Sequence, residues 1–112
     1  MFALVGCAVN QINHVFLTDV RYDPRPKDWP IKLIPKGDPV PTGAHVIASI
    51  NARYHAVMAD HPPDEEYLNK IKDEARSVGG DAIIEFDVWQ APVGTVGAGS
   101  YQISGKIVRF SE

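Results

Sequence analysis

Few residues in this sequence have the types and spacing that a chemical site requires. His55 and His61 bracket a short stretch that also contains Asp60, and such side chains can bind a divalent metal such as zinc. Zinc sites are usually marked by closely spaced histidines or by mixed cysteine and histidine pairs, and neither spacing occurs in the sequence. We therefore expect solvated surface histidines and no bound metal or cofactor, with His55 and His61 as the candidates for a metal site.

Glu85 and Asp87 are the carboxylates best placed for acid–base chemistry, because they alternate along one predicted strand. Such a pair acts as general acid and base only where burial moves the two pKa values apart. We expect both on the solvent-exposed side of a sheet, where they are ordinary solvated charges. Serine, histidine and aspartate also occur, but in no nucleophile motif. The sequence therefore predicts a protein that is not an enzyme.

Residues 94–100 have the rhythm G-x-x-G-x-G, which is also seen in phosphate-binding loops. A phosphate cradle leads into the N-terminus of a helix, and a P-loop ends in Gly-Lys-Ser/Thr. Here a predicted strand follows instead. We interpret the stretch as a hairpin loop and expect no nucleotide.

Composition narrows the class of protein further. The chain has 112 residues and a formal net charge of −3, so we expect one globular domain without the basic surface that recruits a protein to nucleic acid or to an anionic membrane. The single cysteine excludes an intrachain disulfide and a zinc site built on paired cysteines. No apolar run reaches the length of a transmembrane helix.

The elements that would position these residues follow an α+β pattern. Strands are expected over residues 14–20, 31–34, 44–52, 81–89 and 101–110. Residues 35–43 and 54–63 are expected to be loops, and one helix is expected over residues 64–78. The order β-β-β-α-β-β predicts a mostly antiparallel sheet with one helix packed on one face. Residues 14–112 would form this single α+β domain, and residues 1–13 would precede it.

The predicted helix has a clear apolar side and a clear end. Four apolar residues recur at three- and four-residue steps and should form its buried stripe: Leu68, Ile71, Ala75 and Val78. Gly79 and Gly80 should end it, because glycine adopts the left-handed cap conformation at little cost.

Alternation within the strands predicts which side chains share a face of the sheet. In the strand over residues 44–52, three apolar residues should do so: Val46, Ala48 and Ile50. In the strand over residues 81–89, three more should face the core: Ile84, Phe86 and Val88. Such alternation is typical of a sheet with one wet side.

The only cysteine lies in the stretch Leu4-Val5-Gly6-Cys7, just before the first predicted strand. An apolar residue stands three positions before Cys7, and small residues stand directly before it. This arrangement resembles a bacterial lipobox, in which a peptidase cuts before the cysteine and the thiol carries a diacylglycerol. Two or more acyl chains then anchor a protein durably to a membrane.

The lipobox resemblance implies a location and a division of the chain. Residues 1–13 would be a lipobox remnant and a tether, with the rest of the leader upstream of Met1. Lipid on Cys7 would hold the protein in the bacterial cell envelope. Ala8, where an aspartate would retain the protein at the inner membrane, implies the outer membrane facing the periplasm. If Cys7 is instead an incidental cysteine, the alternative location is the cytoplasm.

A second resemblance covers roughly the last half of the chain. The stretch LNKIKDEARSVGGDAII (residues 68–84) and the later SGKIV (residues 104–108) are similar to segments of the YbjQ-like family, known as a heavy-metal-binding family. The same segment occurs in the lipoprotein sensor of the Rcs envelope-stress system. Gly80 and Lys106 replace the alanine and threonine usual in these families. The sensor's disulfides cannot form here, because Cys7 is the only cysteine.

Together the two resemblances imply a small bacterial lipoprotein with a YbjQ-like or Rcs-sensor-like domain. Such a protein would bind or sense another envelope component without catalysis. The alternative that the YbjQ-like family implies is a soluble homo-oligomer that binds a small ligand or a metal.

A proline-rich segment after the first predicted strand is the candidate surface for an envelope protein partner. Its aromatic and proline residues are Tyr22, Pro24, Pro26, Trp29 and Pro30. Prolines favour a stiff extended backbone, which partner proteins often recognise. In the alternative interpretation, Trp29 folds back and covers the edge of the sheet.

Overall fold

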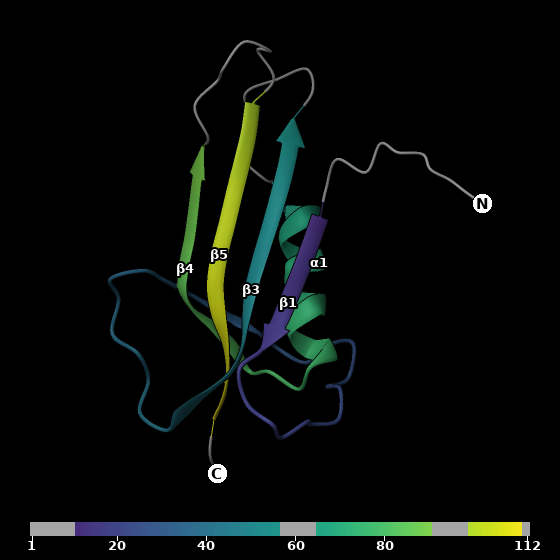
Figure 1. Ribbon diagram of the computed structural model, residues 1–112, viewed down its shortest axis with the longest axis vertical. Coiled ribbons are helices and arrows are strands. Elements are labelled where there is room, and N and C mark those ends of the chain that lie inside the picture. The colour runs from purple at the N-terminus through teal and green to yellow at the C-terminus, as the bar shows by residue number, and fades with distance from the viewer. Residues whose placement is uncertain (1–10, 57–64, 91–98, 111–112) are drawn as a thin grey trace, which may run out of the picture.

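The computed structural model describes residues 11–56, 65–90 and 99–110, and these residues confirm the α+β architecture (Figure 1). The described part contains one helix, α1 (Glu65–Ser77), and five strands. The strands are β1 (Gln11–Phe16), β2 (Lys32–Pro35), β3 (Ala44–Ala56), β4 (Ala82–Gln90) and β5 (Gly99–Phe110). Their order along the chain, β-β-β-α-β-β, is the predicted one.

Three strands lie within two residues of their predicted bounds, and β1 and β3 differ by more. β1 begins at Gln11, within the residues expected to precede the domain, and ends at Phe16. β3 continues to Ala56, within an expected loop. Both extensions follow from strand pairing, since Arg53 of β3 lies opposite Gln11 and the end of β3 pairs with the start of β5. Ladder hydrogen bonds thus extend strands where local sequence gives little sign of them.

The sheet has the strand order β1-β3-β5-β4-β2, so the last strand of the chain lies in its middle. All neighbours are antiparallel except β2 and β4, which are parallel. Helix α1 covers one side, which we call the helix face, and the other side is the open face (Figure 1). The expected mostly antiparallel sheet with one helix on one face is confirmed.

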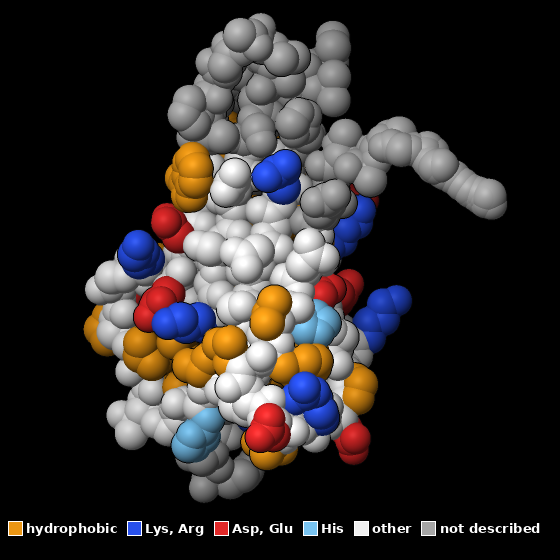
Figure 2. Space-filling view, viewed as in Figure 1, with side chains coloured by type: hydrophobic (Ala, Val, Ile, Leu, Met, Phe, Trp, Pro, Cys, Tyr) orange, Lys and Arg blue, Asp and Glu red, His pale blue; other side chains and the backbone are white. Residues whose placement is uncertain are grey.

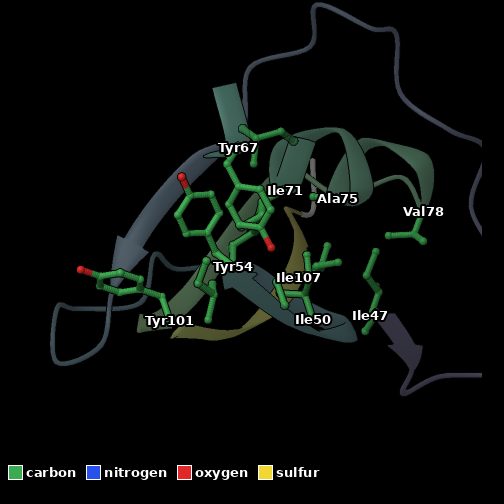
Figure 3. Packing of buried hydrophobic residues seen from close by; sticks show 14 residues of the cluster. Ile47, Ile50, Tyr54, Tyr67, Ile71, Ala75, Val78, Tyr101 and Ile107 are labelled. Carbon is green, nitrogen blue, oxygen red and sulfur yellow. The ribbon is translucent and has the colours of Figure 1, made fainter. Parts of the chain in front are cut away.

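The main hydrophobic core lies between α1 and the helix face (Figure 3). The predicted stripe is buried at Ile71, Ala75 and Val78, whereas Leu68 is half-buried and Tyr67 takes the remaining buried place. The strands contribute five fully buried isoleucines, Ile47, Ile50, Ile83, Ile103 and Ile107, and two buried tyrosines, Tyr54 and Tyr101. Each such side chain contributes about 1.5–3 kcal/mol to stability through burial.

A bulge in β3 makes the predicted common face of Val46, Ala48 and Ile50 wrong. The register of β3 against β5 shifts between Val46 and Ala48, with Ile47 as the extra residue. Ala48 and Ile50 belong to the main core, whereas Val46 packs against a second, smaller cluster around Val108. One inserted residue reverses the facing of every residue beyond it.

A second bulge, in β4, likewise contradicts the predicted common face of Ile84, Phe86 and Val88. The register against β5 shifts between Ile84 and Asp87, and Glu85 adopts a φ of 52°. Ile84 lies in the smaller cluster, whereas Phe86 packs against the main core. Val88 lies opposite the core residue Ile103 and is exposed. Alternating apolar residues therefore fail to predict a single face wherever a bulge intervenes.

Candidate functional site

The C-terminus of α1 forms the turn that positions the proline-rich segment. Gly79 has a φ of 87° and donates its N–H to the carbonyl of Arg76 at 3.0 Å. Gly80 donates to the carbonyl of Ala75 at 2.9 Å, which completes a Schellman cap. A Cβ on Gly79 would lie 2.6 Å from the Cβ of Tyr22. The predicted glycine end of the helix is confirmed, and it also makes room for the segment that crosses it.

Asp81, directly after this turn, is a buried carboxylate with three kinds of donor. The Nη2 atom of Arg25 lies 2.9 Å from Oδ1 and 3.0 Å from Oδ2. The indole Nε1–H of Trp29 donates to Oδ1 at 2.8 Å, and the backbone N–H of Phe110 donates to Oδ2 at 2.9 Å. Asp81 therefore joins the proline-rich segment, the start of β4 and the end of β5.

Further bonds hold the proline-rich segment against α1. The Nε atom of Arg76 donates to the carbonyl of Trp29 at 2.6 Å, and the backbone N–H of Arg25 donates to the carbonyl of Arg76 at 2.8 Å. The guanidinium of Arg25 also lies over the indole ring of Trp29, 4.5 Å from its centre. These contacts fix residues 22–30 across the C-terminal end of α1, and we call this segment the strap.

These contacts show where the predicted partner surface lies. Tyr22 and Trp29 are half-buried and pack against the main core, so Trp29 folds back as in the alternative interpretation. Pro24, Pro26 and Pro30 are exposed. The aromatic rings and the prolines therefore do not form one exposed strip, and the prolines alone face solvent.

Several other predicted site residues cannot be placed. Cys7, Asp60, His61 and residues 94–98 of the glycine-rich stretch lie outside the described residues, whereas Gly99 and Ser100 begin β5. His55 belongs to β3 opposite Ser100, but its side chain is not described. In the described ranges, no group of three or more metal-ligating side chains is found. No helix in those ranges is long and apolar enough to cross a membrane.

The two predicted strand carboxylates are both placed. Glu85 is exposed in the β4 bulge, with one carboxylate oxygen 3.4 Å from the Nζ atom of Lys106. Asp87 is half-buried and lies opposite Ser104. Lys106 and Ser104 are both open-face residues of β5, so both carboxylates lie on the expected side of the sheet, although the β4 bulge changes the spacing between them.

The open face carries a polar depression that sequence reasoning did not identify. It has a volume of about 190 Å³ and is lined by residues of four strands. Besides Ala52 and Ile103, which belong to the core, the depression is lined by six residues of the open face: Asn13, Asn51, Arg53, Trp89, Gln102 and Ser104. Figure 2 shows this face, with backbone and side chains that are neither charged nor hydrophobic over the middle of the sheet, and hydrophobic side chains gathered toward its lower end.

These six side chains line the depression among the described residues. None of them bonds through its side chain to another described residue. Trp89 is 45% exposed, which is unusual for so large an apolar ring. Carboxamides, a hydroxyl, a guanidinium and an aromatic ring can together bind a polar or anionic ligand that has some apolar surface.

Tyr67 links this depression to the core behind it. Its hydroxyl donates to the backbone carbonyl of Arg53 at 3.1 Å, and its ring lies 4.8 Å from that of Tyr54. Burial, with a smaller effect of Tyr54, raises the pKa of Tyr67 to about 12. The hydroxyl therefore stays protonated and fixes the backbone at Arg53 throughout the ordinary pH range.

Alternation could have identified the depression residues singly but not as a group. Arg53 lies between the buried residues Ala52 and Tyr54, and Gln102 lies between Tyr101 and Ile103. Their positions on the open face follow from this pattern. Their proximity depends on register across β1, β3, β5 and β4, which no local pattern fixes.

Comparison with known proteins gives one fold relationship. No protein-family profile and no curated protein matches the chain. The crystal structure of the Francisella virulence factor FvfA, in its orthorhombic form, is similar with a TM-score of 0.62 and 10% sequence identity. The match covers 88% of this chain and 96% of the other. A likeness at this identity is one of fold.

Proposed function

We propose that this protein is a non-catalytic lipoprotein of the bacterial envelope whose domain binds or senses another envelope component. Lipid on Cys7 would be the anchor, and the outer membrane facing the periplasm would be the location. The proposal derives from the lipobox resemblance of Leu4-Val5-Gly6-Cys7. The observation that carries it further is that β1 begins at Gln11, so three residues separate the proposed anchor from the sheet.

The domain would be related to the YbjQ-like and Rcs-sensor-like domains. The residues that carry this resemblance, 68–84, include most of α1, its glycine cap and the start of β4. These residues have structural roles: Gly79 and Gly80 form the turn that ends α1, and Asp81 accepts a hydrogen bond from Trp29 of the strap. The Francisella structure with this fold is named as a virulence factor, and a binding protein of the envelope is consistent with that name.

Metabolic labelling tests the anchor directly. The native gene product is expressed in a bacterial host with radioactive palmitate, beside a Cys7→Ala variant. We expect label and membrane association in the parent and neither in the variant. An Ala8→Asp variant is the matched control, because it keeps the thiol and should keep the label while changing the membrane to which the protein sorts. A soluble, unlabelled parent would refute the proposal.

A soluble homo-oligomer is the second candidate, and one observation favours it. In the described sheet, β1 is an edge strand, and Val15 within it and Leu17 just after it are exposed. An apolar edge can pair with the same edge of a second copy. Sedimentation of the protein and of a Val15→Lys variant tests this, because a lysine there should abolish a dimer built on β1. A monomeric parent would contradict it.

A further inference from the structure

Four residues are paired in one row across the sheet, and the side chains of three of them, Arg53, Gln102 and Trp89, lie on the open face. Gln11 lies opposite Arg53, Arg53 opposite Gln102, and Gln102 opposite Trp89. Adjacent strands are spaced by about 4.8 Å, so the row spans about 14 Å. It contains the exposed indole and the only Lys or Arg side chain that lines the described depression. We call it the Arg53–Trp89 row.

The proposed anchor would bring this row close to the membrane. Cys7 precedes Gln11 by four residues, which span at most about 14 Å of extended chain. Asp81 and the strap lie beyond the other end of β4, seven or more residues from Trp89, at about 3.3 Å per residue. The Arg53–Trp89 row therefore begins on the strand that the proposed tether joins, whereas the strap lies at the opposite end of β4.

The chemistry of the row matches a phospholipid surface. Tryptophan is enriched at membrane–water interfaces, where its ring meets acyl chains and its N–H meets headgroups. Arginine binds phosphate through a planar pair of donors. Arg53 is the one charged side chain that lines the described depression, and the half-buried Asp87 lies two strands away on β4, opposite Ser104. Carboxamides from Asn13, Asn51 and Gln102 supply hydrogen bonds for ester and phosphate oxygens.

The tether determines whether the Arg53–Trp89 row, whose own affinity for a bilayer is low, is bound to the membrane. One arginine on a chain of net charge −3 gives little attraction to a bilayer, so the free protein should not bind vesicles. A short tether raises the effective concentration of the surface to about the millimolar range. The same contacts then become populated without any gain in intrinsic affinity.

We propose that the anchored domain docks with the Arg53–Trp89 row on the membrane, Arg53 on a lipid phosphate and Trp89 among the headgroups. This inference rests on the proposed function, because it requires the anchor at Cys7. It fixes the orientation of the domain, with the strap and its exposed prolines directed away from the bilayer toward other envelope components.

The single cysteine allows a direct test that does not depend on cellular acylation. The purified full chain is coupled through Cys7 to a maleimide lipid in vesicles of phosphatidylethanolamine and phosphatidylglycerol, with or without brominated acyl chains. Brominated lipids quench tryptophan emission at short range. The sequence has two tryptophans, and subtracting the spectrum of a Trp89→Phe variant isolates Trp89. We expect brominated vesicles to quench Trp89 in the coupled protein and not in the uncoupled protein.

Matched variants separate docking from simple proximity. Arg53→Gln should reduce the quenching of Trp89, whereas Lys106→Gln should not. Lys106 lies on the same face and the variant loses the same charge, but it is four residues from Gln102, at about 3.3 Å per residue. Unquenched Trp89 in the coupled parent, or equal effects of the two variants, would overturn the inference.

A carbohydrate is the other ligand that an aromatic ring among carboxamides suits. A shift of Trp89 emission on adding an N-acetylglucosamine oligosaccharide, with no quenching by brominated vesicles, would assign the depression to a glycan and refute membrane docking. Absent palmitate label in cells would refute the proposed function alone, since chemical coupling replaces that step.

Discussion

Replacing Asp81 with alanine should lower the free energy of unfolding by about 3–5 kcal/mol, the cost of breaking a buried ion pair from one side. The side chains of Arg25 and Asp81 are only 18% and 10% exposed, so solvent screens their interaction little. The substitution would leave the guanidinium of Arg25 without its counter-charge, while its buried Nε atom has no hydrogen-bond partner among the described residues even in the parent.

The other two donors to Asp81 account for the upper part of this range. The indole N–H of Trp29 and the backbone N–H of Phe110 would both lose their acceptor. Each buried donor left unsatisfied costs about 1–3 kcal/mol, and water entering the space offsets part of that cost. A loss of this size is a large fraction of the 5–15 kcal/mol, roughly, by which domains are stable.

Urea unfolding measures the effect, with circular dichroism as the probe because Trp29 emission itself will change. Asp73→Ala is the matched control, since Asp73 is 55% exposed and pairs with Arg76 on the surface of α1. It should cost less than about 1 kcal/mol. A double-mutant cycle of Asp81→Ala with Arg25→Met isolates the pair. Equal losses for Asp81→Ala and Asp73→Ala would refute the reasoning.

Three further predictions follow from the core and the bulges. Gly80→Ala should destabilise the fold by about 1–3 kcal/mol through overpacking, because the new Cβ would lie 2.4 Å from Cγ2 of Ile107; a thermal melt unchanged from the parent would contradict this. The free energy of unfolding should fall as pH rises from 10 to 12, because the unfolded chain loses the Tyr67 proton while the folded chain keeps it. Urea titrations over this pH range should show a smaller fall in the free energy of unfolding for Tyr67→Phe than for the parent. Glu85→Val should cost about 1–2 kcal/mol and Glu85→Asn should not, because valine tolerates a φ of 52° poorly; equal midpoints in urea would show that the bulge is unstrained.

The sequence predicts the helix and its end well because those signals are local. Ile71, Ala75 and Val78 lie within two turns, and Gly79 and Gly80 specify the cap without help from distant residues. The sequence does not predict that Tyr67 is buried, because it stands one position before Leu68 of the apolar stripe. Its ring is buried because it packs against the ring of a residue distant in sequence. That partner, Tyr54, comes from a strand expected to have ended by then.

Sheet details were predicted less well because they depend on pairing between distant segments. Nothing around Ile47 or Glu85 marks a bulge, yet each bulge reverses the facing of the residues that follow. The same limit applies to the Arg53–Trp89 row, which forms only when four strands adopt one register. By contrast, the alternative in which Trp29 folds back follows from a local property, because burying a large apolar ring removes it from water.

The central position of β5 determines when this sheet can form. β3 and β4 are separated by β5, the last of the five described strands along the chain. Before residues 99–110 emerge, β4 lacks its antiparallel neighbour and β3 has only the short β1 beside it. Most strand pairing in the described sheet must therefore wait until residues 99–110 have been made. Until β5 is made, the domain lacks its central strand, so β3 and β4 expose backbone groups that pair only in the finished sheet.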